Sequence, residues 1–191
     1  GEDAALKRFH TMVDRRSKRE PLQHITGHAP FRYLDLKVGP GVFIPRQETE
    51  LVVQEGVDWI TKHGMYSAKV VDLCGAIGLS FVTEVPGSEV WAVEKSEQTA
   101  QWTRVNLNET AKKYPSIASN YHLEIADATQ TPTLNQLDGT IDIVLTNPPC
   151  LLRIFRSNRK YATTIPILRY TAVPQMARLF RNALSPVPQN C

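Results

Sequence analysis

The stretch IDIVLTNPPC, residues 141–150, joins a short apolar run to an abrupt stop. The β-branched and apolar residues at 141–145 predict a buried strand that ends at the turn residues after it. Pro148 and Pro149 have no backbone N–H and fixed φ angles, so the strand end presents carbonyl oxygens in fixed directions. With the side-chain oxygen of Asn147, such a carbonyl could bind the two hydrogens of a planar NH2 group. A turn that only ends the strand is the alternative interpretation.

Strand and helix patterns alternate ahead of this stretch, from residue 69 onward. The expected strands cover 70–74, 89–93, 122–126 and 141–145, and the expected helices cover 79–85 and 96–113. Such alternation predicts an α/β domain with a parallel sheet and right-handed crossovers. Ser96 is expected to cap the longer helix, with Ala100, Val105 and Leu107 on its inward face.

Residues suited to ligand binding follow each expected strand, where the ligands of parallel sheets lie. They are Gly75 and Gly78 after the first strand, Glu94 after the second, Asp127 after the third and Asn147 after the fourth. Glycines at a strand-to-helix turn let the backbone approach a ligand closely. Four strand ends with such chemistry indicate one crevice more strongly than any single motif does.

An adenosine-bearing cofactor without a phosphate chain fits this crevice best. Glu94 lies 22 residues beyond Asp72, where an acidic residue accepts from ribose hydroxyls in nucleotide-binding sheets. Asp127 could accept from an adenine amino group, and capping of a helix or turn is the alternative for both carboxylates. The sequence has neither a G-x-G-x-x-G motif nor a G-x-x-x-x-G-K-[ST] loop, which argues against hydride transfer and NTP hydrolysis.

The chain ahead of the α/β pattern is expected to begin with a helix over 4–20. Pro21 blocks its continuation. Short extended pieces are expected over 22–45, among them a strand at 42–44.

A further helix is expected from about residue 47 to residue 62, with Gln47 or Thr49 as its cap. Arg46 and Glu48 stand at its start. They form either a surface pair or a ligand clamp at the mouth of the next domain.

Charge is distributed unevenly along the 191 residues. The net charge is +3, yet all 19 acidic residues precede Cys150, and residues 151–191 contain seven basic and no acidic residues. Such a tail could bind nucleic acid or an acidic partner, or it could be sequence that does not belong to the fold.

Composition predicts a cytoplasmic protein in a reducing compartment. Apolar content is 42% and charged content 21%, and no apolar run approaches the roughly 20 residues that span a bilayer. Three cysteines are too few and too scattered for a disulfide framework or a zinc site, so no metal is expected. No signal-peptide pattern is present, and a start at Gly1 rather than Met leads us to expect a missing or processed N-terminus.

Several segments resemble the Rossmann-like methyltransferases that use S-adenosylmethionine, namely VVDLC with GAIG, AVEKS, ADA and NPP. The segments PLQHITG and FIPRQETE narrow the resemblance to the HemK/PrmC family, over residues from about 15 to 149. That family methylates the side-chain amide nitrogen of a glutamine in peptide chain release factors. The resemblance implies a Rossmann-like class I methyltransferase with S-adenosylmethionine as cofactor and a release factor as protein partner.

The resemblance also implies a division of the chain and a set of site residues. Residues 1–20 would end a helical N-terminal domain, 21–65 form a linker hairpin and the first catalytic helix, 66–150 form the cofactor-binding core, and 151–191 form a basic tail outside the family pattern. Asn147 and Pro148 would be catalytic and, with Pro149 and Cys150, would hold the substrate amide. The expected cofactor-binding residues are Arg46, Asp72, Cys74, Gly75, Glu94, Asp127, Ala128 and Asn147.

Three features depart from the family pattern. The family's cofactor loop reads like DLCTGSGAI, whereas residues 72–77 read DLCGAI. Cys150 stands where the family has Tyr or Phe, and residues 151–191 do not resemble the family. We therefore expect that this is not the intact enzyme, that part of the cofactor loop is missing because it is mobile, and that the sheet lacks C-terminal strands. The tail is expected to stem from a shifted reading frame or from an artificial alteration of the sequence. A natural, degenerate relative is the alternative.

The predicted function is methyl transfer from S-adenosylmethionine to a release factor glutamine. Methylation of a glutamine in a ribosomal protein is an alternative that the sequence hardly distinguishes from methylation of a release factor. Methylation of adenine N6 in nucleic acid is another, since an Asn-Pro-Pro turn also suits an exocyclic amine. An inactive fragment or binding module is the alternative from a different class.

Overall fold

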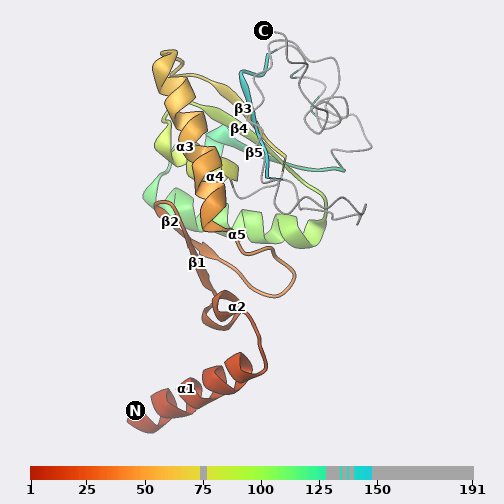
Figure 1. The fold of residues 1–191 in the computed structure, drawn as a ribbon. Helices are drawn as coiled ribbons and strands as arrows, with labels where there is room; N and C mark the ends of the chain where they lie inside the picture. The colour runs from red at the N-terminus through yellow and green to blue at the C-terminus, as the bar shows by residue number, and fades with distance from the viewer. Residues whose placement is uncertain (74–76, 128–133, 135–136, 138–139, 148–191) are drawn as a thin grey trace, which may run out of the picture.

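The computed structural model describes residues 1–73, 77–127, 134, 137 and 140–147 (Figure 1). The chain begins with helices α1 (Glu2–Ser17) and α2 (Leu22–Thr26), followed by the hairpin strands β1 (His28–Phe31) and β2 (Leu34–Lys37). The α/β part contains α3 (Gln47–Lys62), β3 (Lys69–Asp72), α4 (Ile77–Glu84), β4 (Glu89–Glu94), α5 (Glu97–Lys113), α6 (Ile117–Asn120), β5 (Tyr121–Ile125) and β6 (Ile143–Leu145).

The four strands β3 to β6 form one parallel sheet in the order β5-β4-β3-β6. The first strand of the α/β part, β3, is therefore central, and the chain adds strands on one side before it crosses to the other. This order is that of the first four strands of a Rossmann fold, whose ligand crevice opens where the strand order reverses. The expected parallel α/β fold is confirmed, and its switch point lies between β3 and β6.

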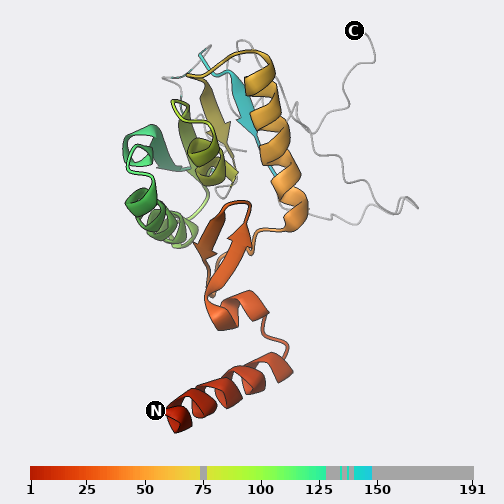
Figure 2. The ribbon, with the colours of Figure 1, turned by 90° about the vertical axis from the view of Figure 1, so that its left-hand side faces the viewer.

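The two faces of the sheet bury different side chains because the side chains of a strand alternate. On one face, Val70, Val90 and Leu145 join the core cluster that includes residues of α3, α4 and α6. Figure 2 shows α3 running alongside the sheet. On the other face, Val71 and Val144 belong to a second cluster, which includes Leu73, Val93, Leu134 and Leu137.

The N-terminal helices differ from expectation. Helix α1 ends at Ser17, ahead of the expected residue 20, because Lys18 is its C-cap and Arg19 adopts a left-handed φ of 68°. The unexpected helix α2 fills the space between Pro21, its N-cap, and Gly27, whose φ of 79° ends it. Figures 1 and 2 show α1 away from the sheet, and none of its residues is buried.

Three expectations for the later segments are wrong. Residues 42–44 form no strand, since the chain turns at Gly41 with a φ of 87° and runs along α5 instead of beside another described strand. Arg46 is the N-cap of α3, with no capping bond from Gln47 or Thr49. Val105 is 43% exposed, because α5 turns Ala100 and Thr103 inward.

The cap of α5 is as expected, with Ser96 Oγ accepting from the Thr99 N–H at 3.2 Å. Among the described helices, none has the length and apolarity to cross a membrane.

Candidate functional site

The carboxyl ends of the four parallel strands meet at one edge of the sheet. The Leu73 N–H donates to the Leu145 carbonyl at 3.2 Å, and the Ala126 N–H donates to the Glu94 carbonyl at 2.9 Å. These bonds join the end of β3 to that of β6 and the end of β4 to that of β5, while β4 runs two residues beyond the partner of Asp72 at the end of β3. Glu94, Asp127 and Asn147 follow or end these strands, as the sequence led us to expect.

Asp72 ends the central strand and is fully buried. Its Oδ2 accepts from the Gly78 N–H at 2.7 Å, in the first turn of α4, where a negative charge is favourable. A Cβ on Gly78 would lie 2.6 Å from Val90 Cγ1. Gly78 is therefore required for close packing of α4 on the sheet, whereas we had expected it to make room for a ligand.

Glu94 lies half-buried at the end of β4. Its Oε1 accepts from the Thr103 hydroxyl at 3.1 Å. Burial raises the pKa of Glu94 above its ordinary value, and the negative charge of Asp72 adds to the shift, while hydrogen bonds from Thr99 and Thr103 oppose it. A carboxylate has about four acceptor positions, so Glu94 retains capacity for a ligand hydroxyl.

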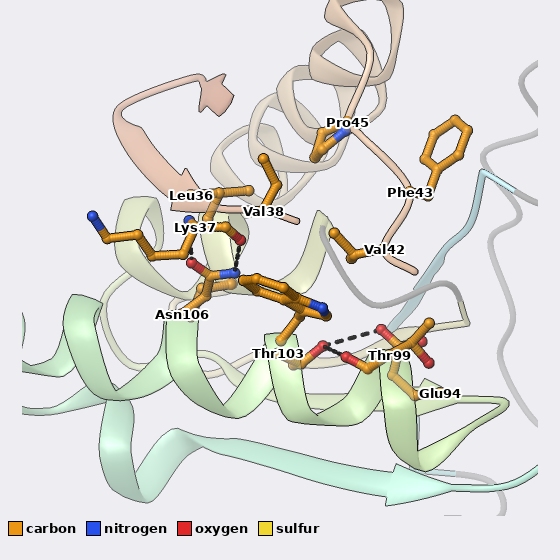
Figure 3. Close-up of a pocket in the computed structure, with 12 residues that line it drawn as sticks. Leu36, Lys37, Val38, Val42, Phe43, Pro45, Glu94, Thr99, Thr103 and Asn106 are labelled. Atoms are coloured by element: carbon orange, nitrogen blue, oxygen red, sulfur yellow. Dashed lines mark hydrogen bonds between the residues drawn. The ribbon is translucent and has the colours of Figure 1, made fainter. Parts of the chain in front are cut away.

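A pocket opens beside Glu94, between the segment after β2 and helix α5 (Figure 3). Thr99 and Thr103 lie beside Glu94, where Thr103 donates to the carboxylate, and Lys37 and Asn106 lie at the other end of the pocket. The wider lining is mostly apolar and comprises Leu36, Lys37, Val38, Val42, Phe43, Pro45, Leu79, Glu94, Thr99, Trp102, Thr103 and Asn106. An apolar cleft with a few convergent polar groups is typical of small-molecule sites.

Asn106 of α5 joins the two sides of this pocket, because its side chain forms hydrogen bonds with the backbone of Lys37 at the end of β2. The Lys37 N–H donates to Asn106 Oδ1 at 2.6 Å, and Asn106 Nδ2 donates to the Lys37 carbonyl at 2.9 Å. Further along the wall, a Cβ on Gly39 would lie 2.6 Å from the Trp102 ring. The segment after β2 therefore packs directly on α5.

Asp127 follows β5 and forms an ion pair with Lys95, whose Nζ is 3.0 Å from Oδ2. The carboxylate is mostly covered while the lysine is exposed. Lys95 follows Glu94, so the pair links the ends of β4 and β5. This contact supports a structural role for Asp127 beside the predicted one.

Asn147 lies two residues beyond β6 and is half-buried. Its Nδ2 donates to the Thr49 hydroxyl oxygen at 2.6 Å. Thr49 stands in the first turn of α3 and is 5% exposed. The Asn147 amide therefore has its donor side engaged by the protein.

Arg46 is exposed, and its guanidinium lies 5.7 Å from the centre of the Phe43 ring. No ion pair joins it to Glu48 among the described residues. Because Phe43 lines the pocket, Arg46 lies near its rim. Its expected part in cofactor binding stays a prediction.

Several expected site residues lie outside the described part of the chain. They are Cys74 and Gly75 in the cofactor loop, Ala128 beside Asp127, Pro148, Pro149 and Cys150 after Asn147, and the whole tail 151–191.

The sequence reasoning missed the residues of α5 that line the pocket. Thr99, Trp102, Thr103 and Asn106 recur at helical spacing, which places them on one face. That spacing was the available signal. Thr49 was considered only as a helix cap, and nothing local in the sequence joins it to Asn147.

Comparison with known proteins gives matches along most of the chain. Residues 2–27 match the profile of the PrmC N-terminal domain. The release factor glutamine methyltransferase of Bifidobacterium longum (strain NCC 2705) is 74% identical over 152 residues, which cover 78% of this chain and 52% of that protein. The protein of the same name from Streptomyces coelicolor (strain ATCC BAA-471 / A3(2) / M145) is 47% identical over 145 residues, covering 74% and 48%.

The chain thus spans about half the length of the curated relatives it matches. Among solved structures, the METTL16 methyltransferase domain is similar with a TM-score of 0.47 and 17% identity, covering 61% of this chain and 47% of that one.

Proposed function

Because this chain is related to the HemK/PrmC family, we propose that it transfers a methyl group from S-adenosylmethionine to the side-chain amide nitrogen of a release factor glutamine. The single observation that carries the proposal is the identity of 74% to a protein named for that activity. Two features of the described structure support the proposal, the pocket beside Glu94 and the position of Asn147 at a strand end.

The residues around the pocket fit the cofactor. Glu94 is a partly desolvated carboxylate with acceptor capacity to spare, as a ribose diol requires. The apolar lining beside it suits the uncharged parts of the ligand. Glu94 would hold the ribose, and Asp127 or the backbone beside it would face the adenine. The bound cofactor would supply an electrophilic methyl group on a sulfonium.

Asn147 would hold the nucleophile. A carboxamide nitrogen is a poor nucleophile because its lone pair is delocalised into the carbonyl. Asn147 Oδ1 would accept one hydrogen of the target NH2, and the Pro148 carbonyl, which lies outside the described residues, is predicted to accept the other. These bonds would draw electron density to nitrogen and fix its direction, and such orientation can supply about 7–11 kcal/mol of a barrier.

The experiment is incubation of the chain with S-adenosylmethionine and a release factor, followed by mass spectrometry of the release factor peptides. We expect one methyl group on a glutamine side chain. Asn147→Ala should abolish transfer and preserve cofactor affinity measured by calorimetry. Asn108→Ala, at an exposed position of α5, is the matched control and should keep both.

The outcomes separate the competing functions. Methylation of a ribosomal protein or of adenine in nucleic acid, with the release factor unmodified, would replace the proposed substrate. Cofactor binding without any transfer would identify a binding module, and an absence of both would identify an inactive fragment. Transfer that survives in Asn147→Ala would refute the role of Asn147.

A further inference from the structure

The side chains of Asn147 and Thr49 meet although 98 residues separate them in the chain. Asn147 Nδ2 donates to Thr49 Oγ1 at 2.6 Å. Thr49 is buried to 5% exposure, whereas Asn147 remains half-buried at the sheet edge. One side of the Asn147 amide therefore faces the protein.

Helix α3 holds Thr49 in this position. The helix packs on β6, and a Cβ on Gly56 would lie 3.0 Å from Leu145 Cδ2. Moving from Leu145 to Asn147 along the strand corresponds to moving back from Gly56 to Thr49 along the helix, so the two elements run antiparallel. Close packing at Gly56 thus brings the first turn of α3 to the carboxyl end of β6.

A side-chain amide has two ends of nearly equal size and opposite hydrogen-bonding character. Its orientation is therefore set by its partners and not by its shape. With Nδ2 engaged by Thr49, Oδ1 is directed away from that partner. This is the orientation that an acceptor for a target NH2 requires.

We propose that Thr49 is a positioning residue for methyl transfer, and that its hydroxyl fixes the Asn147 amide so that Oδ1 faces the target nitrogen. The inference rests on the proposed function, since it assumes that Asn147 Oδ1 accepts from the substrate amide. Thr49 itself touches neither the cofactor nor the substrate in this mechanism.

A purely structural bond between α3 and β6 is the competing explanation, and the two differ in what they affect. A structural tie would lower stability when removed and leave turnover of the folded protein unchanged. A positioning bond would lower kcat while the KM values and cofactor affinity stay as in the wild type. The hydroxyl could also donate to Oδ1 of a flipped amide, which would present a donor to the target.

The test compares Thr49→Val, which keeps the branched shape and loses the hydroxyl, with Thr49→Ser, which keeps the hydroxyl. A misplaced catalytic group can cost up to about 100-fold in rate, so we expect kcat of Thr49→Val to fall about 10- to 100-fold. Thr49→Ser should recover most of that loss. Equal kcat in wild type and Thr49→Val, or an equal loss in Thr49→Ser, would overturn the inference.

Nuclear magnetic resonance of the Asn147 side-chain amide gives a readout independent of turnover. In the wild type, one Nδ2 proton should be shifted downfield and protected from exchange, and Thr49→Val should abolish both effects. Two unprotected Nδ2 protons in the wild type would indicate the flipped amide and overturn the inference. If Asn147→Ala stays active, the proposed function fails. If Asn147→Ala is inactive and Thr49→Val is unaffected, only this inference fails.

Discussion

Arg32 and Glu84 lie 52 residues apart in the chain and form a bidentate ion pair. Arg32 Nε is 2.7 Å from Oε1, and Nη2 is 2.5 Å from Oε2. The side chains are only 10% and 11% exposed. Arg32 stands in the turn between β1 and β2, and Glu84 ends α4, so this pair joins the hairpin to helix α4.

Removal of Arg32 should therefore destabilise the protein strongly. In Arg32→Met, the Glu84 carboxylate would stay largely buried and would keep only the Ser80 hydroxyl, now 2.8 Å away, as its bonded partner from α4. Breaking a buried pair in this way costs about 3–5 kcal/mol, so we expect the free energy of unfolding to fall by about 3 kcal/mol. Urea denaturation measures this change.

The double variant Arg32→Met/Glu84→Met is the control. Because it leaves no unpaired charge, we expect it to be more stable than Arg32→Met alone. Additive losses from the two single variants would show that the pair has no coupling energy, which would contradict the prediction.

Gly78 should be needed for stability because it packs against Val90. Gly78→Ala would place a Cβ 2.6 Å from Val90 Cγ1, on the face where α4 meets the sheet. Overpacking of this kind costs about 1–3 kcal/mol, and we expect the loss in the free energy of unfolding to lie in this range. Thermal and urea unfolding measure it.

Val90→Ala tests the cause of that loss. Val90 is fully buried, so Val90→Ala is itself destabilising. It also removes Val90 Cγ1, the atom with which the new Cβ of Gly78→Ala would clash. The double variant should therefore lose less than the sum of the single variants, and strict additivity would place the strain of Gly78→Ala elsewhere.

The parallel sheet and its strand ends could be predicted because they depend on local patterns. Short apolar runs that end in Glu94, Asp127 and Asn147 identify strands, and parallel pairing follows from the helices between them. The long-range contacts could not be predicted in this way. Neither the bond between Asn147 and Thr49 nor the ion pair between Arg32 and Glu84 leaves a periodic signal in the sequence.

Two local predictions from the sequence were wrong for physical reasons. Residues 42–44 are apolar enough for a strand, but Gly41 turns the chain so that Val42 and Phe43 line the pocket. Helix α2 is short and lacks an apolar period, and Pro21 and Gly27 were its only signals.

Asn106 should be needed for the shape of the pocket. Asn106→Ala would leave the Lys37 N–H and carbonyl without their side-chain partners, and a lost partner of a buried polar group costs about 1–3 kcal/mol. We expect a loss of stability in this range and weaker binding of S-adenosylmethionine, since Asn106 and Lys37 both line the pocket. Asn108 lies two residues further along α5 and is exposed, so Asn108→Ala should change neither the stability nor the binding of S-adenosylmethionine. Unaltered stability in Asn106→Ala would show that the pairing with Lys37 is dispensable.

Glu94 should show opposite effects on stability and binding. Burial raises the pKa of Glu94 above its ordinary 4.5, so the unfolded chain releases this proton at a lower pH than the folded chain does. Glu94 therefore lowers the free energy of unfolding as pH rises from about 4.5 through its folded pKa.

We accordingly expect Glu94→Gln to be more stable than the wild type at pH 7, with the difference vanishing below about pH 4. The amide oxygen can still accept from Thr103, so the fold keeps that bond. Loss of the charged acceptor should weaken S-adenosylmethionine binding about ten- to hundredfold, because hydrogen bonds to charged groups contribute about 1.5–3 kcal/mol. Urea denaturation at both pH values and calorimetric titration measure the two effects.

The control is Glu97→Gln, at an exposed position in the first turn of α5, which should leave cofactor affinity unchanged. A gain in stability without a loss of affinity would mean that Glu94 is desolvated for some purpose other than the cofactor, and a loss of both would make it a structural residue.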